Sequence, residues 1–145
     1  VLERLGRNER VNDGMDISLC MIDRTAGTLS WSGANSDLLF VSGGAVQEVK
    51  AHRQPIGRSD NRTRFPTHCL RLAPGDTIYL MSDGLVDQFG GPRGKKFMAH
   101  ALRELLLAVD HLPMPDRKAR IEEAFLAWKG DLDQVDDVTL VGIRL

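Results

Sequence analysis

Acidic side chains stand at two places where an apolar segment begins or ends. Asp83 directly follows one apolar run and precedes Gly84, and Asp136 and Asp137 directly precede the last apolar run. If both runs are strands, the strand ends fix the carboxylates, and Gly84 lets the chain turn sharply without a side chain. Fixed carboxylate oxygens suit a hard divalent cation such as Mg²⁺ or Mn²⁺. Each pattern also has a structural interpretation, because an Asp-Gly pair is often only a turn and an Asp-Asp pair often only a solvated loop.

Other patterns that could support chemistry are weaker. The four histidines share no ligand spacing, and no Gly-x-Ser-x-Gly nucleophile elbow occurs. The glycine pairs lack the pattern of a nucleotide-binding loop. Cys20 and Cys69 form no Cys-x-x-Cys motif and lie in apolar runs, so we expect reduced core cysteines.

A cluster of cations precedes a predicted helix. Arg93, Lys95 and Lys96 would oppose the dipole at the start of that helix. Two interpretations stay open: a solvated face, or a flap that receives an acidic or phosphorylated partner.

The elements that must position these residues run from hairpins to helices. The patterns predict strands at residues 17–22, 29–34, 38–41, 46–49, 70–72, 78–81 and 138–145, and helices at 97–109 and 115–129. Residues 1–6 resemble the last turns of a helix, and residues 12–14 a turn. The run at 17–22 is almost wholly apolar, which is typical of a strand covered on both faces. Hairpins followed by two helices and a strand predict an α+β fold, an antiparallel sheet with helices packed on its face.

Length and composition indicate one ordinary globular domain. The chain has 145 residues, of which 42% are hydrophobic and 27% charged. A net charge of -1 gives no electrostatic case for binding nucleic acid or an anionic membrane. No apolar run approaches the ~18 residues of a membrane span, and no signal peptide is present. We therefore expect a cytoplasmic domain.

Several short motifs resemble one family, in order along the chain. The run LMSDGLVD at residues 80–87 resembles the "(S/T)-D-G-hydrophobic" segment of the metal-dependent, PPM-type serine/threonine protein phosphatases, and DDVTL at 136–140 resembles their closing segment. Three further motifs resemble the bacterial branch named after the stage II sporulation protein E: GAN at 33–35, PIG at 55–57 and LAPGD at 72–76. The resemblance spans nearly the whole chain.

The resemblance implies a fold, a metal centre and a reaction. The family's fold is an αββα antiparallel β-sandwich with flanking helices, with two Mn²⁺ or Mg²⁺ ions at one end. In that family a metal-activated water attacks the phosphorus of a phosphoserine or phosphothreonine directly. The family's two C-terminal metal positions match Asp83 and Asp136, and Asp137 is the alternative to Asp136. Gly84 belongs to the same site, and Asp87 is either an outer residue that orients water or a helix N-terminal carboxylate.

The sequence also departs from the family's pattern. The family's first metal Asp and its "D-x-(S/T)-G-H-G" segment should lie upstream of the strand at 17–22, and residues 1–16 contain neither. We therefore expect residues 1–145 to be the C-terminal portion of a single phosphatase domain, incomplete at the N-terminus and inactive alone. The chain begins with Val1 rather than Met, and we expect that it was cut from a longer protein.

Two functions of different classes follow. The first is a protein phosphatase acting on a phosphorylated partner protein, by family analogy an anti-sigma-factor antagonist-like (STAS) protein. The second is a catalytically silent phosphatase-like module that binds a partner protein.

The run at residues 87–97 resembles a subgroup common behind membrane or response-regulator modules, so we expect an upstream sensor or receiver domain, which would also supply any membrane anchor. Strands without their neighbours should leave apolar surface uncovered beside residues 17–22 or 138–145, so we expect a homodimer or aggregation.

Overall fold

The computed structural model describes residues 14–57 and 63–145, and the chain divides into two compact units. The first unit is Val1–Leu38 with Val49–Ala73, and the second is Leu39–Glu48 with Pro74–Leu145. The helix expected at residues 1–6 lies outside the described residues, as do the first two residues of the turn expected at 12–14.

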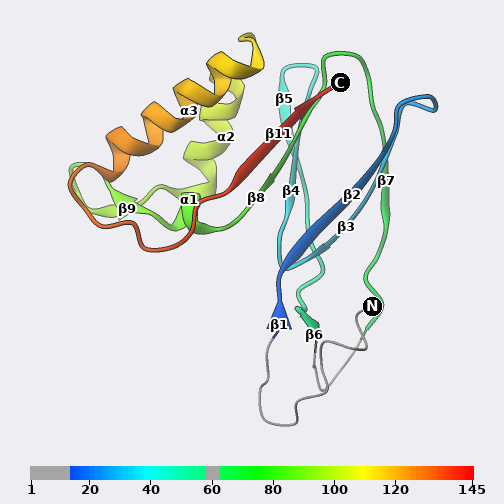
Figure 1. Cartoon of the computed structure of the whole chain (residues 1–145), viewed down its shortest axis with the longest axis horizontal. Helices are drawn as coiled ribbons and strands as arrows, with labels where there is room; N and C mark the ends of the chain where they lie inside the picture. Colours follow the sequence, from blue (N-terminus) through cyan, green and yellow to red (C-terminus); the bar gives the residue numbers. More distant parts are fainter. Residues whose placement is uncertain (1–13, 58–62) are drawn as a thin grey trace. The chain divides into compact units, whose positions relative to one another are not determined.

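The first unit is built on a three-stranded antiparallel sheet (Figure 1). Its strands, in the order β2-β3-β7, are β2 (Ile17–Asp23), β3 (Thr28–Ala34) and β7 (His68–Arg71). A separate two-stranded ladder joins β1 (Gly14–Met15) to β6 (Ile56–Gly57). The core side of β3 carries Leu29 and Trp31, which are almost fully buried.

One face of β2 is open. Leu19 and Met21 are 64% and 68% exposed, so the expectation of a strand covered on both faces is wrong. On the opposite face, the Trp31 indole N–H donates to Ser18 Oγ at 2.7 Å. An unbroken apolar run shows that no polar residue interrupts the strand, but it does not show what covers each face. The open face matches the expectation of uncovered apolar surface beside residues 17–22.

The two cysteines are free and lie in different surroundings. Cys20 on β2 is half-buried, and burial raises the pKa of its thiol. Cys69 on β7 is exposed, so the expectation of a core position is wrong for this residue.

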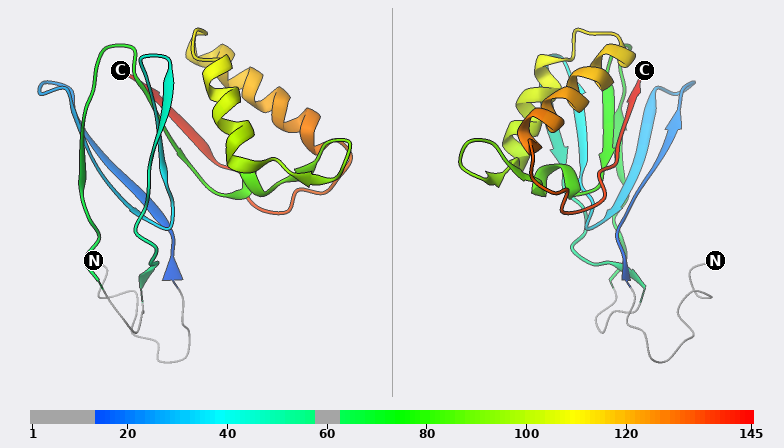
Figure 2. Two further views of the ribbon diagram at one scale, coloured as in Figure 1. Left: turned by 180° about the vertical axis from the view of Figure 1, so that it is seen from behind. Right: turned by 60° about the vertical axis from the view of Figure 1, so that its left-hand side comes forward.

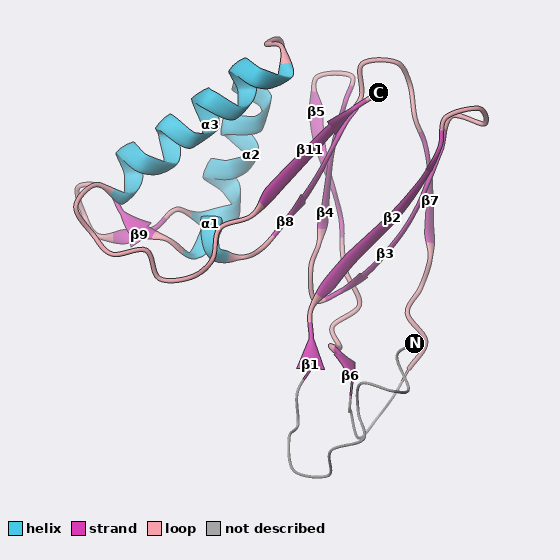
Figure 3. Ribbon diagram, viewed as in Figure 1, coloured by secondary structure: helices cyan, strands magenta, loops and turns pink. Residues whose placement is uncertain are grey.

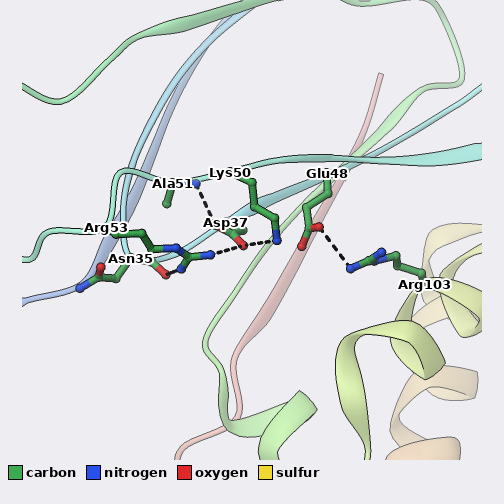
Figure 4. Close-up of polar contacts among 7 residues, drawn as sticks. All are labelled: Asn35, Asp37, Glu48, Lys50, Ala51, Arg53 and Arg103. Carbon is green, nitrogen blue, oxygen red and sulfur yellow. Dashed lines mark hydrogen bonds and ion pairs between the residues drawn. The ribbon is translucent and has the colours of Figure 1, made fainter.

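Asp37, in the loop between β3 and the next strand, joins that loop to residues 50–53 (Figure 4). Asp37 accepts the Ala51 N–H at 2.8 Å and forms ion pairs with Lys50 and Arg53, both at 3.1 Å. Partial burial by itself raises the pKa of the Asp37 carboxyl. The hydrogen bond from Ala51 and the charges of Lys50 and Arg53 outweigh that effect, so this pKa lies below its ordinary value.

The second unit is built on a four-stranded sheet in the order β11-β8-β4-β5 (Figure 3). Its strands are β4 (Leu38–Ser42), β5 (Ala45–Val49), β8 (Thr77–Met81) and β11 (Leu140–Arg144). β11 runs antiparallel to β8, from the pair Leu140–Met81 to the pair Arg144–Thr77. The strand predicted at residues 78–81 is thus β8, and the strand predicted at 138–145 begins two residues later than expected.

Two helices pack side by side on one face of this sheet, as Figure 2 shows from two sides. They are α2 (Met98–Ala108) and α3 (Met114–Lys129). Between β8 and α2 lie α1 (Gly84–Asp87) and a hairpin of β9 (Phe89–Gly90) and β10 (Lys95–Lys96). The core between sheet and helices contains Leu39, Val41, Tyr79, Leu85, Phe97, Leu102, Leu106, Val109, Ile121 and Phe125.

Two arginines tie the helices to the sheet. Arg117 of α3 is 1% exposed and donates to Thr77 Oγ1 at 2.9 Å and Tyr79 Oη at 3.3 Å, both on β8. Arg103 of α2 forms an ion pair with Glu48 of β5 at 3.2 Å (Figure 4). α3 is therefore anchored to the strand that leads to Asp83.

The fold class predicted from the sequence, α+β with antiparallel strands and flanking helices, is confirmed. Within residues 14–57 and 63–145, no helix combines the length and the apolar character that crossing a membrane requires.

Candidate functional site

Asp83 stands at the end of β8, where the chain leaves the sheet and enters α1. It occupies the N-cap position of α1, and its carbonyl accepts the N–H of Asp87 at 3.0 Å. Its carboxylate makes no capping hydrogen bond and is exposed. The strand and the short helix fix the backbone of Asp83, and the carboxylate is left available for a ligand.

The second acidic motif lies against this turn, although the two residues that join them, Ser82 and Asp137, are 55 positions apart in the sequence. Ser82 Oγ donates to the carbonyl of Asp137 at 2.8 Å and accepts the N–H of Thr139 at 2.9 Å. The Ser82 N–H donates to the Thr139 carbonyl at 3.0 Å. One serine therefore joins the segment before β11 to the segment after β8.

Gly84 makes the close approach possible. A Cβ placed on Gly84 would collide with the carbonyl oxygen of Asp137. Any larger residue would push the Asp136–Asp137 segment away from Asp83. Gly84 therefore leaves room for the backbone of Asp137 to pack directly against its own backbone.

Asp136 and Asp137 are both exposed, and their local bonds differ. Asp136 Oδ1 accepts the N–H of Asp137 at 2.7 Å, and the Asp136 carbonyl accepts Gln134 Nε2 at 2.8 Å. Asp137 holds the segment through its carbonyl bond to Ser82. Both acidic residues are thus placed at the same strand ends as Asp83.

The donor set fits a hard cation only in part. Asp83, Asp136 and Asp137 offer carboxylate oxygens, which Mg²⁺ and Mn²⁺ prefer. However, no group of three or more His, Cys, Asp or Glu side chains within residues 14–57 and 63–145 is arranged to hold a metal ion. Further ligands are needed to complete a two-ion centre.

Asp87 and the cationic cluster contact each other. Lys96 Nζ lies 3.0 Å from Asp87 Oδ2, and both side chains are about half exposed. Arg93 and Lys95 form no ion pair within the described part of the chain. The cluster lies on the β9–β10 hairpin, directly before α2, whose N-cap is Phe97.

The hairpin that carries these cations has a fixed base. The Gly91 N–H donates to the carbonyl of Trp128 at the end of α3, at 2.7 Å. A Cβ on Gly91 would lie 2.8 Å from the Trp128 ring. Trp128 also packs edge-on against Phe97, with ring centroids 5.5 Å apart. Gly90 and Gly91 thus serve close packing on Trp128, and the cations lie on the exposed part of the hairpin.

Sequence reasoning did not assign a role to Ser82 or to the buried Gln88. Ser82 is part of the quoted motif, and its small hydroxyl between a strand and an Asp-Gly pair was the available signal. Gln88 is 0% exposed and bonds to the loop before β11. Nothing in its sequence neighbourhood marks a buried amide.

Comparison with known proteins places the chain in a family. The family model described as stage II sporulation protein E (SpoIIE) matches residues 2–145. No curated protein sequence matches the chain.

Solved structures agree with this match. The SiaA-PP2C domain of Pseudomonas aeruginosa is 31% identical, with a TM-score of 0.87 over 96% of this chain and 55% of that one. The phosphatase domain of the cell fate determinant SpoIIE from Bacillus subtilis is 18% identical, with a TM-score of 0.68 over 90% of this chain and 56% of that one. The RsbU and RsbW domains of a Mycobacterium tuberculosis protein are 20% identical, with a TM-score of 0.77 over 98% of this chain and 39% of that one.

The chain spans about half the length of the first two of these structures. The latter two likenesses show the fold alone. The family match covers nearly every residue, and the predicted motifs meet in the structure. The chain therefore belongs to the stage II sporulation protein E family of PP2C-type phosphatase domains.

Proposed function

We propose that residues 1–145 form the C-terminal portion of a metal-dependent serine/threonine protein phosphatase domain. The observation that carries this proposal is the junction of the two acidic motifs through Ser82, with Gly84 packed against Asp137. A turn that only reverses the chain does not need a second acidic segment fixed against it.

In this proposal Asp83 and Asp136 are metal ligands, with Asp137 as the alternative to Asp136. Two Mn²⁺ or Mg²⁺ ions would supply Lewis acidity and lower the pKa of the water that attacks the phosphoryl group. The chain's own part is to hold carboxylates at two strand ends, which fixes the positions that the ions take. The remaining carboxylates would come from other segments of the domain.

The substrate we propose is a phosphoserine or phosphothreonine protein of a bacterial signalling pathway. A STAS-type partner is proposed by family analogy. The M. tuberculosis relative, which carries RsbU and RsbW domains, and the P. aeruginosa protein PppA, described as a regulatory component of a secretion system, support a regulatory setting. An upstream sensor or receiver domain is part of the same proposal.

The test uses the intact protein and a phosphoserine protein as substrate. Asp83→Asn and Asp136→Asn should abolish Mn²⁺-dependent hydrolysis and leave the melting temperature near that of the wild type, because the amide keeps the shape but removes the charge. Asp131→Asn, in the same loop and also exposed, is the matched control and should retain activity. Wild-type turnover in Asp83→Asn and Asp136→Asn would show that these residues are not ligands.

The second candidate is a catalytically silent binding module. Both candidates are compatible with the lack of a metal-holding group of three side chains in the described residues. The two candidates separate in the same assay: a silent module in its intact protein binds its partner without any Mn²⁺-dependent loss of phosphate.

A further inference from the structure

The loop between α3 and β11 carries the proposed ligand Asp136 but has no regular secondary structure of its own. Residues 131–137 are all exposed, and no helix or strand includes them. A loop of this kind keeps a carboxylate in place only if other groups hold its backbone.

Two neutral side chains from outside the loop hold this backbone, one on each side of Asp136. Ser82 binds the carbonyl of Asp137 and the N–H of Thr139. On the other side, Gln88 Nε2 donates to the carbonyl of Asp133 at 2.9 Å, and Gln88 Oε1 accepts the N–H of Val135 at 3.3 Å. Asp136 therefore lies between two points of attachment.

Gln88 is itself held in place. Its side chain is fully buried, and the amide also donates to the carbonyl of Phe89 at 3.0 Å. Its backbone carbonyl accepts the N–H of Phe97 at 2.9 Å and the Trp128 indole N–H at 3.2 Å. A glutamine fixed by both its backbone and its side chain can act as a rigid support for the loop.

We propose that Gln88 is a positioning residue for the metal-binding carboxylate of Asp136. The proposal rests on the proposed function, because it concerns the same metal centre. A carboxylate whose loop is already ordered loses little conformational freedom when an ion binds. Mutation of residues that hydrogen-bond directly to metal ligands typically weakens metal affinity by about 10- to 100-fold, and Gln88 acts through the loop backbone, so we expect the lower end of that range.

The chain offers a matched control in its other unit. Gln54 is also buried, and its amide also holds a loop, since Oε1 accepts the N–H of Thr63 at 3.0 Å and Nε2 donates to the Thr63 carbonyl at 3.5 Å. Gln54 thus shares with Gln88 its residue type, its burial and its bonds to backbone. It differs in that its hydrogen bonds go to Thr63 and not to the Asp136 loop.

The experiment compares Gln88→Met with Gln54→Met in the intact protein. Each change keeps the approximate length of the side chain and removes both polar groups of the amide, the donating NH₂ and the accepting carbonyl oxygen. We expect Gln88→Met to raise the half-saturating Mn²⁺ concentration at least about 10-fold, with kcat at saturating Mn²⁺ close to that of the wild type. In the absence of metal, amide hydrogen exchange of residues 131–139 should become faster in this variant. Gln54→Met should change neither the half-saturating Mn²⁺ concentration nor the hydrogen exchange of residues 131–139.

Equal shifts in both variants would overturn the proposal, because they would show a general loss of stability. An unchanged Mn²⁺ dependence in Gln88→Met would overturn it as well. If Gln88→Met does not fold, Gln88→Asn is the milder test. Its shorter amide reaches at most one of the two loop groups, so the same shifts should appear at smaller size, and their absence would refute the proposal.

Failure of the proposed function has a different signature. A wild-type protein that neither binds Mn²⁺ in calorimetry nor hydrolyses the phosphoprotein would refute the phosphatase proposal. If the wild type is active and Gln88→Met has the same half-saturating Mn²⁺ concentration, only the positioning role is refuted.

Discussion

Ser82 illustrates how a neutral residue can organise charged ones. Its hydroxyl is donor and acceptor at once, which lets a single atom bind a carbonyl and an N–H of the facing segment. An alanine at this position would leave both backbone groups without that partner. The serine makes the joining bonds, so the Asp83 and Asp137 carboxylates are not needed to hold the two segments together.

Asp37 gives a prediction at the scale of one residue, because its lowered pKa links stability to pH. A carboxyl with a lowered pKa stabilises the fold above its ordinary pKa of 3.8, and this contribution is lost as the pH falls through the folded-state value. Asp37→Asn should therefore lower the free energy of unfolding by about 1 kcal/mol at pH 7, through weaker bonds to Lys50, Ala51 and Arg53.

Urea unfolding of wild type and Asp37→Asn at a series of pH values measures this difference. The gap between the two proteins should close as the pH falls below 3.8, when the wild-type carboxyl also loses its charge. A gap that stays constant from neutral to acidic pH would contradict the argument.

At the scale of elements, the regular strands and helices could be predicted from the sequence because their periodicity is local. β8 and α3 match their expected ranges to within one residue at each end. The short α1 and the β9–β10 hairpin could not be predicted, because contacts with distant residues such as Trp128 fix them. Arg117 was also missed, since a charged residue in a helix is usually exposed, and only the structure shows its bonds to β8.

The same limit applies to the candidate site. The two acidic motifs could be found because each combines an acidic residue with a strand end. Their junction through Ser82 and the support from Gln88 depend on bonds between segments about 50 residues apart, which no local pattern records. The prediction that both faces of β2 are buried was wrong for a related reason, because the burial of a strand depends on which other segments pack against it.

The β9–β10 hairpin yields the prediction at this scale. Arg93 and Lys95 are exposed and unpaired within the described residues, whereas Lys96 is paired with Asp87. If the hairpin receives the phosphoprotein, Arg93→Gln with Lys95→Gln should raise KM for the phosphoprotein about 10-fold and leave KM for a small aryl phosphate nearly unchanged. The comparison of the two substrates separates capture of the protein from chemistry at phosphorus.

Lys96→Gln serves as the control, because it also removes one positive charge but from a residue already engaged by Asp87. Addition of the same change to the double variant gives the full neutralisation of the cluster. Equal losses on both substrates, or no loss on either, would show that the hairpin is only a solvated face.

At the scale of the whole molecule, apolar surface gathers beside the edge strand β11. A groove of about 780 Å³ between α3 and β11 is lined in part by Leu126 and Val141, which are 53% and 46% exposed. β11 pairs with β8 on one side, and on its other side no strand of the described residues pairs with it. An open edge with exposed apolar residues favours pairing with a second copy.

The isolated 145-residue chain should therefore bind Mn²⁺ poorly, show no phosphatase activity and form dimers or aggregates. Carboxylates at only two positions are too few to replace the water molecules that two divalent ions would have to give up. Calorimetry with Mn²⁺, a phosphopeptide assay and light scattering measure the three properties on one sample. Val141→Lys on the edge strand should reduce association, while Leu107→Lys on α2 should not. Tight Mn²⁺ binding with turnover by a monomer would place the active site entirely within these residues.

The pairing of β11 with β8 has a consequence for how the protein is made. β11 is synthesised after every other described element, and the Asp136 loop becomes attached only when that strand closes the sheet. The two acidic motifs can therefore be joined only after residues 136–139 have been synthesised. A chain shortened before residue 136 lacks Asp136 and Asp137, and it also lacks β11, which leaves the edge of β8 that β11 covers unpaired. Loss of the second acidic motif and exposure of a strand edge therefore occur together.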